Sequence, residues 1–159
     1  MLHNTKIDIA KGKREKVIEL LNARLADAID LQSQVKQAHW NVKGMHFIAL
    51  HELFDQVSTA VLVYIDDLAE RVTTLGGTAL GTVRVSAENS TLSQYPLEIT
   101  DGEAHVDALS TVMASFGKAV RKNIDDADEL GDKDTADLFT GISREIDKLL
   151  WFVEAHAQA

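Results

Sequence analysis

The stretch that decides the fold runs from Gln37 to Gly77 and reads QAHWNVKGMHFIALHELFDQVSTAVLVYIDDLAERVTTLGG. Within this stretch, the segment from Phe47 to Leu75 contains no glycine or proline. Apolar residues recur in that segment at helical spacing: Phe47, Leu50, Phe54, Val57, Val61, Tyr64, Leu68, Val72 and Leu75. This period predicts one long amphipathic helix that buries its apolar face in a bundle. Gly76 and Gly77 follow at once, and glycine commonly ends a helix.

Two pairs of polar residues lie on this helix, each pair one turn apart: His51 with Asp55, and Asp66 with Glu70. At about 100° per residue, all four point away from the apolar stripe. The two pairs share a face because Asp55 and Asp66 are nearly three turns apart, which puts them roughly 16 Å from each other along the axis. The ligands of one metal ion lie within about 2–2.6 Å of it, so a single ion cannot contact both pairs.

A second copy of the same helix would solve this problem. If two copies cross in antiparallel orientation near Ala60 or Val61, a two-fold axis sets the first pair of one chain opposite the second pair of the other, twice over. Ser58, Thr59 and Ala60 are small enough to let the two helices approach closely. The spacing therefore predicts a site shared between two subunits.

His39 fits the same place. It lies six residues before Met45, and His51 lies six residues after it. A chain reversal around Gly44 would set the two histidines side by side on antiparallel helices. The predicted site then has two histidines and three carboxylates, and such nitrogen and oxygen ligands without thiolate suit iron, zinc or manganese. Either pair alone is also compatible with a solvated helix face, so the hypothesis depends on all five residues meeting.

The chain resembles the Dps family, the mini-ferritins of the ferritin-like superfamily. The segments that carry the resemblance are HWNVKG at His39–Gly44, HELFD at His51–Asp55, DDLAER at Asp66–Arg71 and DKLLWFVEAH near the C-terminus. The resemblance implies a ferroxidase centre at a two-fold interface. Its ligands would be His39, His51 and Asp55 from one subunit and Asp66 and Glu70 from its neighbour.

The resemblance further implies a hollow dodecamer that oxidises Fe(II), one or two ions per site, and stores ferric mineral inside. Hydrogen peroxide is the expected oxidant, with dioxygen as the other candidate, and the cell would be protected from oxidative damage. Two alternatives stay open at this point. One is a DNA-compacting nucleoid protein with an incidental metal site, and the other is a shell that binds zinc or manganese with little oxidase activity.

We expect an all-α fold, a ferritin-like four-helix bundle of residues 13–159 preceded by a short flexible leader of residues 1–12. About 25 residues from Gly76 to Asp101 form the long crossover that such a bundle needs, with a short helix expected around Ser86–Ser93. Asp101 is the predicted N-cap of the third long helix and Asp132 that of the fourth, with Gly131 as the intervening C-cap.

Composition restricts the function classes. The net charge of −9 favours attraction of cations and argues against strong affinity for nucleic acid. Binding of DNA through the few basic residues near the N-terminus would be weak; these are Lys6, Lys11, Lys13, Arg14 and Lys16. The absence of cysteine fits a cytoplasmic protein, with or without nucleoid association, and no apolar run of membrane-spanning length is apparent.

An acidic segment lies between the third and fourth long helices. A ring of its carboxylates, repeated by three-fold symmetry, would form a pore that draws Fe(II) inward. The candidate pore residues are Asp128, Asp132, Asp134 and Asp137, of which Asp137 matches the family best. Acids at a helix N-terminus also complement the helix dipole, which is the simpler interpretation. The other histidines belong to no such pattern and are expected at the surface: His3, His46, His105 and His156.

Overall fold

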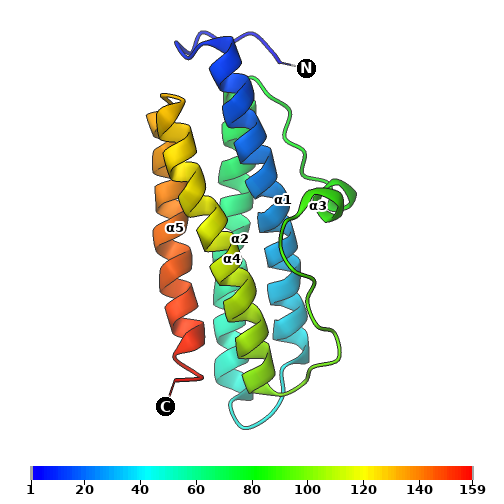
Figure 1. Ribbon diagram of the computed structural model, residues 1–159. Helices are drawn as coiled ribbons and strands as arrows, with labels where there is room; N and C mark the ends of the chain where they lie inside the picture. Colours follow the sequence, from blue (N-terminus) through cyan, green and yellow to red (C-terminus); the bar gives the residue numbers. More distant parts are fainter. Residues whose placement is uncertain (1, 159) are drawn as a thin grey trace.

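The computed structural model describes residues 2–158 and confirms an all-α, ferritin-like bundle. Its helices are α1 (Lys11–Asn41), α2 (Phe47–Thr74), α3 (Val83–Asn89), α4 (Gly102–Glu129) and α5 (Lys133–Glu154). The four long helices run side by side, and the crossover that carries the short α3 returns along α1 (Figure 1). The α1–α2 turn therefore lies at one end of the bundle and the α4–α5 turn at the other.

The α2 helix matches its prediction closely. It spans Phe47–Thr74, and the expected stripe is buried except for Phe47, which is partly exposed. Gly76 follows with φ of +87°, where an L side chain would be strained. The amide of Gly76 donates to the carbonyl of Thr73, and that of Gly77 donates to Val72, both at 2.9 Å. These two bonds satisfy the last carbonyls of the helix and end it.

The turn between α1 and α2 is fixed from two sides. Gly44 adopts φ of +107°, which allows the sharp reversal that the sequence predicts. The amide of Lys43 donates to the carbonyl of Thr100 at 3.0 Å, which ties the turn to the end of the crossover. Next to it, the Asp101 carboxylate accepts from the amide of Ala104 at 2.9 Å and caps α4 as predicted.

The crossover helix is shifted from its predicted place. It spans Val83–Asn89 rather than Ser86–Ser93, because the Thr82 side chain caps its first turn and Ser90 has returned to extended backbone. Polar groups of α1 then hold the crossover. The buried Asp27 carboxylate accepts from the amide of Thr91 at 2.7 Å and pairs with Arg24 at 3.0 Å. This contact accounts for two charged residues, Arg24 and Asp27, that are buried on the otherwise apolar face of α1.

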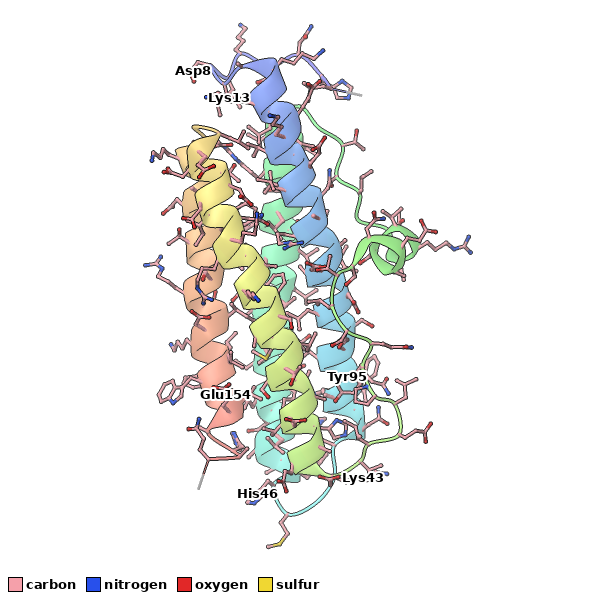
Figure 2. The ribbon with its side chains drawn as sticks, viewed as in Figure 1. Asp8, Lys13, Lys43, His46, Tyr95 and Glu154 are labelled. Carbon is pink, nitrogen blue, oxygen red and sulfur yellow. The ribbon has the colours of Figure 1, made fainter. Side chains whose placement is uncertain are left out.

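The leader contacts the end of the bundle where α2 finishes. The amide of His3 donates to the carbonyl of Gly76 at 2.7 Å. The guanidinium of Arg14 donates to the carbonyls of Ile9 and Leu75 at 3.1 and 2.7 Å. Helix α1 begins at Lys11, two residues before the predicted domain boundary, so the first helical turn already belongs to the bundle. Figure 2 labels Asp8 and Lys13 at this end.

Candidate metal centre

The reversal at Gly44 brings His39 and His51 together. His39 lies in the last turn of α1, and His51 lies in the second turn of α2. Their imidazole rings stack with centroids 3.7 Å apart and planes inclined by 21°. The two histidines are each six residues from Met45 in the sequence, and in the structure they make a direct contact between two antiparallel helices.

Each imidazole is held by the backbone of the other residue. Nδ1 of His39 lies 2.8 Å from the carbonyl oxygen of His51, and Nδ1 of His51 lies 2.8 Å from the carbonyl oxygen of His39. A carbonyl can only accept, so both Nδ1 atoms carry the proton and donate. A neutral ring with Nδ1–H presents the lone pair of Nε2 to a metal, and such a second hydrogen bond is the usual support of a ligating histidine.

Asp55 lies beside the two histidines and is exposed on α2. One of its carboxylate oxygens is 4.0 Å from Nδ1 of His39 and 2.8 Å from Nζ of Lys36. The hydrogen bond from Lys36 is the largest effect on the pKa of Asp55 and lowers it; desolvation opposes this, and the charges of Lys36 and of the two histidines add smaller lowering effects. The carboxylate is therefore ionised at neutral pH and ready to bind a cation. Lys36 is a site residue that sequence reasoning missed, although it lies one turn before His39.

Asp66 and Glu70 lie elsewhere. Both are exposed on α2, in its C-terminal half, roughly 16 Å along the axis from Asp55. Neither side chain has an ion pair or hydrogen bond within residues 2–158. Across the same residues, no three histidine or acidic side chains are grouped to hold a metal ion. A single chain thus brings His39 and His51 into contact, with Asp55 4.0 Å from His39, and leaves Asp66 and Glu70 exposed in the other half of the helix.

The surface of α2 between the two pairs includes exposed apolar side chains. Leu62 and Val63 are about half exposed, next to the predicted crossing point at Ala60 and Val61. By length and composition alone, α2 is apolar enough to cross a membrane, contrary to the sequence expectation. Only a third of its most apolar stretch is buried in this chain. Val61 and Tyr64 pack in the bundle core. Leu62 and Val63 lie on the opposite, exposed face of α2, which a second copy could cover.

The acidic segment between α4 and α5 splits into two kinds of residue. Asp132 is only 1% exposed: its carboxylate caps α5 by accepting from the amide of Thr135 at 3.0 Å and pairs with Arg71 of α2 at 2.7 Å. Asp132 was predicted to line a pore, and this prediction is not met, because its carboxylate is buried in contacts with Thr135 and Arg71 inside the bundle. Asp128 pairs with Lys133, and Asp134 and Asp137 are exposed. A pore would therefore depend on these three.

His105 is not a surface histidine. It is 1% exposed in the first turns of α4, where Nδ1 lies 2.5 Å from the hydroxyl of Tyr95 in the crossover. The sequence did contain a signal for its burial, because His105 stands one turn before Leu109 and continues the apolar stripe of α4. The contact was not predictable, since Tyr95 belongs to a segment without regular structure.

The chain is a helical bundle whose α2 helix carries candidate histidine and carboxylate ligands in both of its halves, and comparison with known proteins shows which family this bundle belongs to. Residues 18–159 match the family model described as a ferritin-like domain. A DNA protection during starvation protein of Agrobacterium fabrum is 47% identical over 98% of this chain and 96% of its own length. Its counterpart in Mycolicibacterium smegmatis is 35% identical over 95% of this chain and 82% of its own.

Solved structures lead to the same family. The tetragonal form of Mycobacterium smegmatis Dps superimposes with a TM-score of 0.95 at 33% identity, covering 100% of this chain and 96% of that one. DpsC from Streptomyces coelicolor gives 0.95 at 29% identity, covering 100% and 93%. The chain is a ferritin-like protein, and within that superfamily it belongs to the Dps family.

Proposed function

We propose that this chain is the subunit of a ferroxidase and iron store that oxidises Fe(II) at sites shared by two subunits. One observation carries the proposal. His39 and His51 stack with both Nδ1 atoms donating to the backbone and Asp55 lies beside them, while Asp66 and Glu70 stand unpaired within the described chain, on the same helix. A two-fold axis across the apolar middle of α2 would complete two such sites at once.

The residues divide the chemistry between them. The imidazoles would hold Fe(II), and the three carboxylates would stabilise the more highly charged Fe(III) that forms. With hydrogen peroxide as oxidant, two Fe(II) ions give two electrons, and the peroxide takes up two protons and leaves as two waters. The same ligands would accept zinc or manganese. Ferric ion would hydrolyse and accumulate in a hollow cytoplasmic dodecamer. The reaction would thereby remove both Fe(II) and hydrogen peroxide, which together damage the cell.

Iron would enter near the α4–α5 turn. Asp128, Asp134 and Asp137 lie at the surface there, and three-fold repetition in a dodecamer would bring nine carboxylates around one opening. Asp137 is the member with no ion pair among residues 2–158, so its charge is the least compensated.

DNA is the second candidate partner, and the name of the relatives favours it. The net charge of −9 opposes it, and the basic residues near the N-terminus are few. Any complex should therefore be weak and lost as salt increases, because binding depends on counterion release from phosphates. A gel shift that persists well above physiological salt at neutral pH would make DNA binding the primary function. Deleting residues 1–11 would then test whether the leader is responsible.

Mixed oligomers test the shared site. One subunit carries His51→Ala and Asp55→Ala, the other carries Asp66→Ala and Glu70→Ala, and each mixed interface keeps one intact site because its second site collects all the lesions. Random mixing should restore roughly a quarter of the wild-type sites, since half of the interfaces are mixed. Oligomers of either mutant alone should oxidise no Fe(II) above background. Background oxidation in the mixture, with assembly verified by size-exclusion chromatography, would refute a shared site.

A further inference from the structure

Tyr95 and His105 form a buried pair beside the candidate metal centre. The Tyr95 hydroxyl lies 2.5 Å from Nδ1 of His105, and the two side chains are 7% and 1% exposed. Nε2 of His105 makes no hydrogen bond within residues 2–158. The backbone carbonyl of Asn41, two residues after His39, faces the same imidazole. Figure 2 labels Tyr95 in the crossover, close to the end of the bundle that carries Lys43 and His46.

The protons of this pair can be placed. Desolvation lowers the pKa of His105, against smaller opposite effects of Asp101 and the Asn41 carbonyl, so the imidazole is neutral at neutral pH. Desolvation likewise raises the pKa of Tyr95, so the phenol keeps its proton. The phenol therefore donates and Nδ1 accepts. Loss of the proton alone is disfavoured, but an electron and the proton can leave together, because the acceptor for the proton is already in contact.

A route for the electron lies in the same region. Tyr95 and Trp40 line one groove between α1 and the crossover. Trp40 is 67% exposed and directly follows His39, and the Lys36 ammonium that pairs with Asp55 also lies 5.8 Å from the centre of its ring. An oxidant released at the candidate centre would thus meet the indole first, with Tyr95 as the next oxidisable group in the groove.

We propose that Tyr95 and His105 are a one-electron relay that takes up the oxidising equivalent left when peroxide reacts with a single Fe(II). The proposal rests on the proposed function for the source of the oxidant. One Fe(II) reduces hydrogen peroxide to hydroxide and hydroxyl radical. Trp40 gives an electron to the radical, which becomes hydroxide, and the indole radical cation is restored by an electron from Tyr95.

The phenolic proton of Tyr95 passes to Nδ1 of His105 in that step. The products are a neutral tyrosyl radical and an imidazolium, whose charge balances the hydroxide. A second Fe(II) resets the pair: its electron reduces the tyrosyl oxygen, the proton returns from Nδ1, and a second Fe(III) is formed. The relay would thereby let one peroxide oxidise two Fe(II) ions that arrive one after the other.

Tyr64 is the matched control, because the sequence contains only these two tyrosines. It is also buried, at 2% exposed, but its hydroxyl makes no hydrogen bond within the described chain. Desolvation raises its pKa, and the negative charge of Glu145 adds to this. Tyr64 thus resembles Tyr95 in burial and differs in its surroundings, because its hydroxyl faces the Glu145 carboxylate, whereas that of Tyr95 contacts an imidazole.

The experiment uses the assembled protein without iron and generates azide radicals, which oxidise indoles by one electron, by pulse radiolysis. In the wild type, the optical band of the tryptophan radical should decay as the tyrosyl band grows, at a rate independent of protein concentration. Tyr95→Phe should abolish the tyrosyl band, whereas Tyr64→Phe should leave it unchanged.

A positioned base contributes roughly 10²–10⁴-fold to proton transfer, so His105→Asn should slow the step by about 100-fold or more. Trp40→Phe should remove the fast phase, and Trp151→Phe should retain it.

A tyrosyl band that survives Tyr95→Phe, or that never appears in the wild type, would overturn the relay. Should a buried substitution prevent assembly, the wild type alone still decides: transfer must be slower in D2O, and an unchanged rate refutes coupling to the proton. A parallel arm with Fe(II) and peroxide separates the two proposals. Tyrosyl formation with azide radicals but no iron oxidation would refute the ferroxidase function and leave the relay intact, and the reverse result would refute the relay alone.

Discussion

The two ends of the bundle are built differently, although α2 connects them. At the α1–α2 end, His39 and His51 exchange hydrogen bonds with each other's backbone and leave their Nε2 atoms available. At the α4–α5 end, Arg71 and Asp132 form an ion pair in the interior, and the other aspartates stay outside. The first end preorganises two candidate ligands, and the second end uses its polar contacts to fix the position of a helix.

This difference explains why one chain could hold only part of the proposed site. Asp66 and Glu70 are near the second end, where Arg71 anchors α2 to α5, and the histidines are at the first end. The rigid helix between them keeps the two groups apart by about three turns. Completing the proposed centre would therefore need a second copy rather than a movement within the chain.

The largest expected effect comes from breaking the anchor at the second end. Asp132→Ala removes the α5 cap and leaves the Arg71 guanidinium half-buried without its partner, so the free energy of unfolding should fall by about 3 kcal/mol or more. Urea unfolding at neutral pH measures this. Asp134→Ala removes a side chain that is 85% exposed and should change stability by less than about 0.5 kcal/mol. Equal effects would mean that the buried pair does not stabilise this end.

The two turn glycines should separate stability from metal binding. Gly44 and Gly131 both have positive φ, +107° and +82°, so Gly44→Ala and Gly131→Ala should each cost about 1–3 kcal/mol in urea unfolding. Only Gly44→Ala should also weaken binding of Co(II) in calorimetry, because only that turn sets the stacking of His39 and His51. Gly141→Ala, in open space within α5, should instead stabilise by about 0.5–1 kcal/mol. Weakened Co(II) binding by Gly131→Ala would contradict the distinction.

A smaller effect is expected from the exposed charge at the second end. In the proposed dodecamer, Asp137→Asn would remove three charges from each three-fold opening, and each lost charge would matter by about 1 kcal/mol for an approaching Fe(II). Iron uptake measured by stopped-flow absorbance should slow at low ionic strength and recover at high salt or saturating Fe(II). Asp107→Asn, an exposed acid near the opposite end, is the control. If both variants take up iron at the wild-type rate in low salt, the second end is not the entrance.

The smallest effect concerns the ion pair at the first end. Lys36→Met removes the main cause of the lowered Asp55 pKa, so a carboxyl titration followed by NMR should move upward toward the ordinary value of 3.8. A lowered pKa stabilises the fold above the ordinary value, and this contribution is lost as pH falls through the folded pKa. The stability difference should thus be present at neutral pH, stay below about 1 kcal/mol because Asp55 is exposed, and vanish in acid. Lys118→Met should leave the Asp55 pKa unchanged.

The sequence by itself determined the elements and one half of the candidate site. The 3.6-residue period placed α2, Gly76 and Gly131 marked two helix ends, and Asp101 and Asp132 marked two helix starts. These features depend on neighbours within one or two turns, which the sequence displays directly. The meeting of His39 and His51 was predictable for the same reason, because a tight turn fixes the register of the two helices that it joins.

Only the tertiary structure decided which polar side chains have a hydrogen-bond or ion-pair partner. Asp132 is buried because Arg71, 61 residues earlier, lies across from it, and His105 is buried because the crossover brings Tyr95 over α4. Lys36 holds Asp55 across the α1–α2 interface, 19 residues away. Such pairs form between elements whose relative rotation depends on the packing of the whole core. A local period states which face of a helix is polar, but the partner on the next helix exists only once the bundle has been assembled.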